Sequence, residues 1–66
     1  MKKRIINIPS FQLLSKVKIE SLNIIGTIVD ISSERNGINY YIIEQTLEDG
    51  SGKLHYSIKG NDLTLI

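Results

Sequence analysis

The sequence predicts an all-β domain built from five short strands, and three observations lead to this prediction. Five glycines follow one another at short intervals from Gly26 onward, and runs rich in β-branched residues lie between them. The segments 16–20 and 53–59 alternate apolar and polar side chains, as a strand with one solvated face does. An Asn-Gly pair at 36–37 separates two apolar runs, and this pair is preferred in two-residue hairpin turns.

The length and composition predict a single domain with a small core. A chain of 66 residues buries only about 60% of the surface that its unfolded form exposes. The sequence contains no cysteine and a single histidine, His55, so it predicts neither a disulfide nor a zinc site. Packing or association must therefore supply the stability.

The charge is nearly balanced, with eight Lys and Arg against seven Asp and Glu and a pI near 8.0. A dedicated nucleic-acid binder usually has a basic patch and a higher pI. No apolar stretch approaches the ~20 residues of a membrane span, and Asn7, Pro9 and Ser10 interrupt the run that a signal peptide would need. We therefore expect a cytoplasmic protein without a membrane partner, and the abundance of isoleucine fits a bacterial or phage genome rich in A and T.

Residues 1–15 predict an extension that packs on the domain. Six of them are Ile, Phe or Leu, a density that disordered segments lack. The stretch RIINI at 4–8 predicts a short strand, and Pro9 ends strand pairing there. The following stretch predicts one helical turn, with Phe11 and Leu14 on the same side.

The segment 16–20 predicts a first strand of the domain, with Val17 and Ile19 facing the core. The run 24–31 has apolar residues in both phases of the alternation, which fits a long strand that passes from one sheet to another. Gly26 fits the bend of this strand, because a side chain would clash at a tight corner.

A type I′ turn at Asn36–Gly37 predicts the register of the hairpin that follows, and pairs Ile31 with Ile42. One face of the hairpin then collects apolar side chains: Val29, Ile31, Tyr40 and Ile42. The opposite face is mixed, since Tyr41 and Ile43 lie there beside Asp30, Ser32 and Gln45. We therefore expect the first face to form the core.

The next connection, at 48–52, predicts a five-residue loop that pairs Thr46 with Leu54. A two-residue turn at Asp49–Gly50 would shift the register by one and send the apolar side chains outward, which is costly. The strand 53–59 then has one apolar face, with Leu54, Tyr56 and Ile58, and one solvated face, with Lys53, His55, Ser57 and Lys59.

The chain is expected to end in a tight or 3₁₀ turn at 60–62 and a short strand at 63–66. Asp62 can accept backbone hydrogen bonds in the turn. Leu63 and Leu65 are expected to point inward.

The stretches KVKIESLNIIGTIVDI, YYIIE and HYSIKGNDLTLI resemble small SH3-like β-barrels, notably KOW-like and uncharacterised bacterial or phage proteins of that fold. The residues that carry the resemblance are Val17, Ile19, Gly26, Thr27, Ile28, Val29, Asp62, Leu63 and Leu65. The resemblance implies a five-stranded barrel over 16–66, with 1–15 as an N-terminal extension. KOW-type proteins usually surround this core with Lys and Arg, whereas SSERNGINYY and TLEDGSG are mixed or acidic here.

Two surfaces are candidate binding sites. Tyr41 and Ile43 lie on the second face of the hairpin, which residues 1–15, a second copy of the chain or a foreign protein would cover. A positive stripe would form if the strands that carry its residues are neighbours: Lys16, Lys18, Lys53, His55 and Lys59.

No catalytic, metal-binding or cofactor-binding motif is present in the sequence. His55 has no partner in a Ser–His–Asp pattern, and the carboxylates lack the spacing of a calcium loop. We therefore expect no cofactor and a non-enzymatic module that binds a protein, such as an accessory or mobile-element protein that modulates a host factor. The alternative is a KOW-like nucleic-acid binder.

Overall fold

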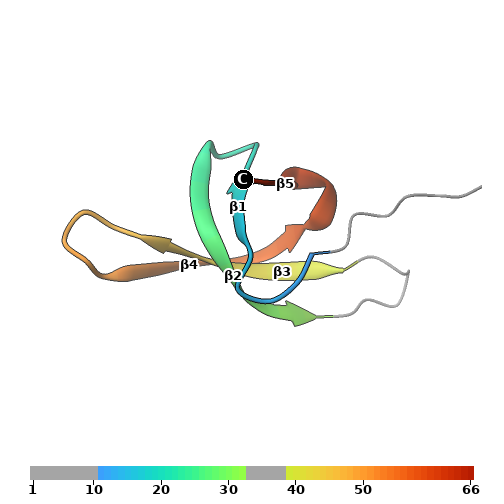
Figure 1. The fold of residues 1–66 in the computed structure, drawn as a ribbon, viewed down its shortest axis with the longest axis horizontal. Helices are drawn as coiled ribbons and strands as arrows, with labels where there is room; N and C mark the ends of the chain where they lie inside the picture. Colours follow the sequence, from blue (N-terminus) through green and yellow to red (C-terminus); the bar gives the residue numbers. More distant parts are fainter. Residues whose placement is uncertain (1–10, 33–38) are drawn as a thin grey trace, which may run out of the picture.

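The computed structural model describes residues 11–32 and 39–66, which form one antiparallel sheet of five strands (Figure 1). The strands are β1 (Lys16–Ile19), β2 (Ile24–Ser32), β3 (Tyr40–Thr46), β4 (Gly52–Lys59) and β5 (Leu63–Leu65), with a 3₁₀ helix, η1 (Gly60–Asp62), before the last. Their order in the sheet is β4-β3-β2-β1-β5, which places β4 and β5 at the two edges. The all-β prediction is confirmed, and the sheet is not closed into a barrel by pairing between its two edges.

Strand β2 is long and pairs with a neighbour on each side within the single sheet, so the expected passage from one sheet to another is not seen. It pairs with β1 from Ile24 to Thr27 and with β3 from Thr27 to Ser32. A Cβ atom at Gly26 would stand 2.6 Å from the Glu44 carbonyl oxygen of β3. The predicted clash of a side chain at this position is therefore confirmed.

The buried face of the sheet, called the inner face below, is the opposite of the predicted one. Its buried side chains are Val17, Ile19, Ile28, Tyr41, Ile43 and Leu63. The predicted core residue Val29 is 37% exposed, and Tyr40 and Ile42 are only half-buried on the other side, the outer face. Ile31 is also half-buried, but it packs against the core.

A register shift explains this inversion. Ile31 pairs with Tyr41 instead of Ile42, and the register shifts again between Ile28 and Asp30. Because side chains alternate with a period of two, a slip of one residue exchanges the two faces. The Asn36–Gly37 turn itself lies outside the described residues.

The connection between β3 and β4 contains five residues, as predicted, but begins one residue earlier. The Leu47 amide donates to the Ser51 carbonyl at 2.8 Å, and Thr46 pairs with Gly52 instead of Leu54. The carboxylate of Asp49 accepts hydrogen bonds from the Ser51 amide (2.9 Å) and hydroxyl (2.6 Å). The loop is therefore stabilised from within.

Strand β4 is interrupted by a bulge, where Tyr56 and Ser57 stand opposite the single residue Ile42. Ser57 adopts a φ of 57°, in the left-handed region that non-glycine residues rarely enter. Ile58 returns to the inner face opposite Tyr41, in agreement with its predicted core role. Leu54 and Tyr56 do not: they are 42% and 62% exposed, because the register places them on the outer face.

The turn predicted at 60–62 is confirmed as η1, and Asp62 connects it to the β1–β2 turn. The Asp62 carboxylate accepts hydrogen bonds from the Ser21 amide (2.9 Å) and hydroxyl (2.5 Å), and the Asp62 carbonyl accepts from the Glu20 amide at 2.8 Å. Leu63 is buried as expected, whereas Leu65 is 61% exposed at the edge of the sheet.

Residues 11–15 form a β-turn where the sequence predicts a helical turn. The Ser15 amide donates to the Gln12 carbonyl at 3.2 Å, and Leu14 has a φ of 69°. Positive φ at the third position is typical of a type II turn. The strand predicted at 4–8 lies outside the described residues.

Candidate functional site

Tyr41 and Ile43, two predicted surface residues, are part of the core and have no exposed surface. The Phe11 ring packs edge-on against the Tyr41 ring, with centroids 5.6 Å apart and planes at 80°. The Phe11 amide also donates to the Tyr41 hydroxyl at 3.2 Å. These two residues are therefore no docking surface. Phe11 packs on Tyr41, and the rest of the predicted cover, residues 1–10, lies outside the described residues.

The predicted positive stripe is not present, because β2 and β3 separate β1 from β4 in the sheet. Lys16 and Lys18 lie on the outer face of β1, since their neighbours Val17 and Ile19 are buried. Lys53 and His55 lie on the inner face opposite Gln45 and Ile43, while beyond the bulge Lys59 pairs with the outer-face residue Tyr40. The five basic residues are thus divided between two strands and two faces.

His55 is half-buried and has a hydrogen-bonding partner on the neighbouring strand. Its Nε2 lies 2.9 Å from Gln45 Oε1, which suits donation from an Nε2–H group to the amide oxygen. This contact joins β3 to β4 near the loop that connects them. Within 11–32 and 39–66, no three His, Cys, Asp or Glu side chains lie close enough to hold a metal ion.

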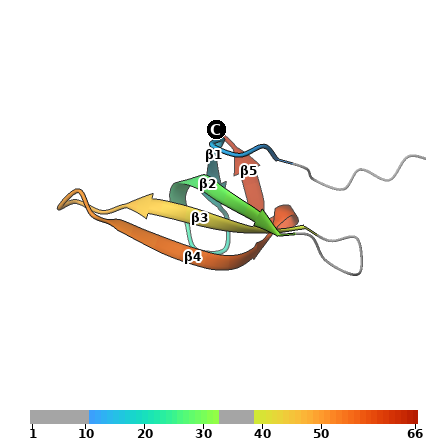
Figure 2. The same ribbon diagram turned by 90° about the horizontal axis from the view of Figure 1, so that it is seen from below.

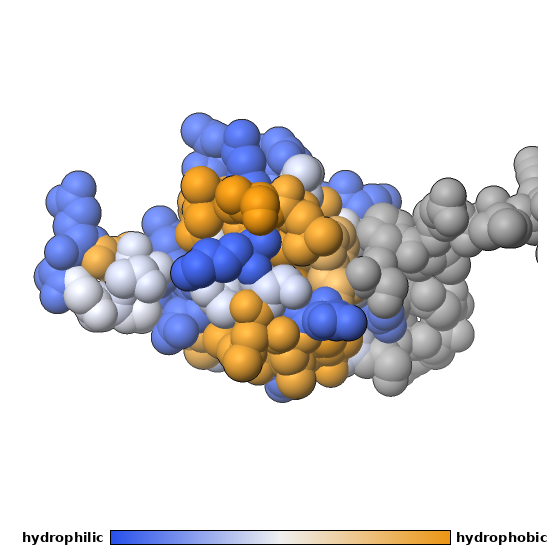
Figure 3. All heavy atoms as spheres, in the orientation of Figure 1, coloured by the Kyte–Doolittle hydropathy of each residue, from blue (hydrophilic) through white to orange (hydrophobic). Residues whose placement is uncertain are grey.

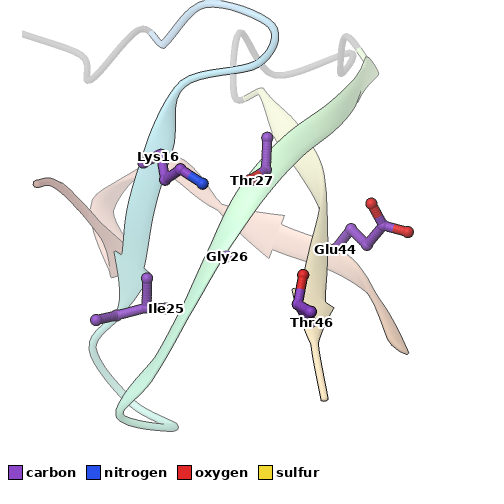
Figure 4. A pocket seen from close by; sticks show the side chains of 6 residues that line it. All are labelled: Lys16, Ile25, Gly26, Thr27, Glu44 and Thr46. Carbon is purple, nitrogen blue, oxygen red and sulfur yellow. The ribbon is translucent and has the colours of Figure 1, made fainter. Parts of the chain in front are cut away.

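A shallow hollow of about 250 Å³ opens on the outer face over β2 (Figure 4). Its lining combines one cation, one carboxylate, two hydroxyls and apolar surface: Lys16, Ile25, Gly26, Thr27, Glu44 and Thr46. In Figure 4 the Lys16 side chain extends toward Thr27, whereas the Glu44 carboxylate points away from Lys16. Glu44 is the one carboxylate in this lining.

The feature that sequence reasoning missed is the exposure of Leu54 and Tyr56 on β4, which were expected in the core. Leu54 and Tyr56 are two residues apart on an edge strand, and both are exposed. Figure 2 shows β4 along the lower rim of the molecule, with the β3–β4 hairpin extending beyond the other strands. The bulge in β4 could not be predicted from the sequence. Its residue with positive φ is Ser57, whereas glycine is the residue that usually marks such a position.

Exposed apolar side chains occur elsewhere too, but they are spread over several elements. Figure 3 shows two separate apolar areas on one face, with more hydrophilic residues between them. Among the described residues, the exposed large apolar side chains outside β4 are Leu13, Leu14, Leu22, Ile25, Val29, Leu47, Leu65 and Ile66. Single exposed apolar side chains are common on soluble proteins. Leu65 lies on the other edge strand, β5, which has three residues against eight in β4.

No family model, curated protein or solved structure matches this chain. Across the two described stretches, no helix has the length and apolar character that crossing a membrane requires.

Proposed function

We propose that this chain is a small, non-enzymatic module that binds another protein through β4. The observation that carries the proposal is the exposure of Leu54 (42%) and Tyr56 (62%) on an edge strand. A strand edge leaves backbone donors and acceptors unpaired, and large apolar or aromatic side chains supply most of the binding energy at protein interfaces. Strand β4 combines both features.

An SH3-like barrel is the fold that we propose for this module. Three features support it: the strand order β5-β1-β2-β3-β4, a long β2 shared between two halves, and a 3₁₀ turn before the last strand. They agree with the resemblance of residues 16–66 to that fold. Small barrels host many activities, so the binding role is argued from β4 and not from the fold.

A protein is favoured over a nucleic acid by the distribution of charge and aromatic rings. Single-stranded nucleic acids require a basic groove with aromatic side chains on which bases stack. Lys16 and Lys53 lie on opposite faces of the sheet, and the Tyr41 ring is buried. Tyr56 is exposed (62%), so the described residues offer one largely exposed ring for stacking, and their lysines are divided between the two faces of the sheet.

The test is binding between purified proteins, after a partner has been captured from the source organism with the wild-type chain. Tyr56→Ser should weaken binding at least ~10-fold, the loss expected when an aromatic contact at an interface centre is removed. Ile25→Ser is the matched control, because Ile25 is similarly exposed (57%) but lies on β2. Equal losses in the two variants, or none in either, would argue against β4 as the binding surface.

Fluorescence titration with single- and double-stranded oligonucleotides tests the alternative function. We expect no binding at low salt. Binding with a steep salt dependence would identify a nucleic-acid module and overturn the proposal.

A further inference from the structure

We infer that the partner adds an extended strand to the free edge of β4, and that this strand alternates acidic and apolar residues. The inference rests on the proposed function and specifies the chemistry of the partner. It follows from three properties of β4: its unpaired edge, the different character of its two sides, and its lack of carboxylates.

The first half of β4 provides a regular template for strand addition. Residues 52–55 pair without interruption with 43–46 of β3, and β4 has no neighbour on its other side among the described strands. An extended peptide can satisfy such an edge with main-chain hydrogen bonds, while its alternate side chains give specificity. The bulge at Tyr56 and Ser57 limits the regular template to this half.

The side chains of this half differ between the two faces. Lys53 and His55 lie on the inner face, opposite Gln45 and Ile43. Leu54 lies on the outer face opposite Glu44, and Tyr56 follows two residues later. An added strand would place alternate side chains beside Lys53 and beside Leu54, so acidic residues suit the first set and apolar residues the second.

The charge of β4 disfavours a second copy of this chain as the added strand. The strand contains Lys53 and Lys59 but neither Asp nor Glu. Within the regular half, antiparallel self-pairing centred on Lys53 would set two lysines opposite each other, and pairing centred on His55 would set the two imidazoles opposite each other. Edge lysines commonly prevent self-association. In β4 the lysines disfavour a second copy of the chain, while Leu54 and Tyr56 remain accessible to a strand that contains acidic residues.

The probes are three eight-residue peptides, titrated into the ¹⁵N-labelled full chain and followed by amide chemical shifts. The first alternates valine and glutamate, the second replaces glutamate by lysine, and the third has the composition of the first in two blocks. The first should bind ~10-fold more tightly than the second, because attraction replaces repulsion at the charged positions. It should also bind more tightly than the block peptide, shift the amides of 52–56 and slow their hydrogen exchange.

Two variants test the role of charge. Lys53→Glu should remove the preference for the acidic peptide, whereas Lys16→Glu, on the outer face of β1, should retain it. Sedimentation of the wild-type chain should show a monomer at the concentrations used.

Several results would overturn the inference. These are no binding at millimolar peptide, equal affinity for the acidic and basic peptides or for the alternating and block peptides, shifts centred away from β4, and a dimer formed through β4. If the peptides fail while Tyr56→Ser still abolishes binding to the captured protein, the proposed function stands and strand addition is wrong.

Discussion

Gly26 is the residue at which the sheet is most sensitive to added volume. A Cβ atom at this position would lie 2.6 Å from both the Glu44 carbonyl oxygen and the Ile43 Cγ2 atom. The first of these is a main-chain atom of the neighbouring strand β3, which cannot move aside as a flexible side chain can. The sequence pattern anticipates this site because glycine is the only residue without a Cβ.

Gly26→Ala should lower the free energy of unfolding by about 1–3 kcal/mol, the usual effect of overpacking a core. Urea denaturation followed by tyrosine fluorescence measures it. Gly50→Ala is an informative comparison, because Gly50 has a φ of 89° and open space around its Cα. Its cost comes from the backbone conformation alone, about 1 kcal/mol. If Gly26→Ala has the same urea midpoint as the wild type, a Cβ atom at position 26 does not clash with β3.

Ser57 is a second residue with a specific conformational requirement. Its φ of 57° lies in the left-handed region, which costs an L-residue about 1–2 kcal/mol and glycine much less. Ser57→Gly should therefore stabilise the chain by about 0.5 kcal/mol after the larger entropy of the unfolded glycine is subtracted. Ser57→Val should destabilise it, because β-branched residues resist positive φ. Thermal melts of both variants give the order, and a Val variant more stable than the Gly variant would contradict the bulge.

In the β3–β4 hairpin, short-range hydrogen bonds stabilise the loop, whereas a bulge at the other end of β4 sets the strand register. Its loop from Leu47 to Ser51 is held by short-range hydrogen bonds, and the strands are joined by the His55–Gln45 contact. The five-residue length of the loop could be predicted, because a shorter turn is costly in register. The residue at which the loop begins could not be predicted, because the bulge at Ser57 changes the alternation of side chains at the far end of β4.

The Asp49 carboxylate makes this loop sensitive to acid. Hydrogen bonds from the Ser51 hydroxyl and amide lower the pKa of Asp49 below its ordinary value of 3.8. Because the folded pKa is lower than the unfolded one, the stabilisation is fully present above pH 3.8 and is lost as the pH falls through the folded pKa. An NMR titration of the Asp49 carboxyl carbon should give a midpoint below 3.8 in the wild type and a higher one in Ser51→Ala. Identical midpoints would show that Ser51 does not stabilise the ionised carboxylate.

At the scale of the whole molecule, the segment before β1 completes the core of an open sheet. The Leu14 amide donates to the Ile28 carbonyl at 2.8 Å, and the Ile28 amide donates to the Ser15 carbonyl at 3.0 Å. These bonds hold 11–15 against β2 and bring Phe11 onto Tyr41. A small domain depends strongly on each such contact, because its core is limited.

Phe11→Ala should lower the free energy of unfolding by about 1–3 kcal/mol, since a half-buried aromatic side chain is lost. It should also make the Tyr41 hydroxyl more accessible to a diffusing fluorescence quencher. Leu13→Ala is the control, because Leu13 is 56% exposed and should change stability little. If the two variants melt alike, Phe11 does not cover the core.

The sequence by itself determined the elements of this protein. Alternation and turn residues placed the five strands and the 3₁₀ turn at 60–62, because each depends on neighbours along the chain. The tertiary structure alone decided which face is buried. The register shifts near Val29 and Ser57 move Tyr41 and Ile43 into the core and turn Leu54 and Tyr56 outward. No local propensity records such a shift, since the register is selected by the packing of the whole sheet, and the candidate binding surface depends on that selection.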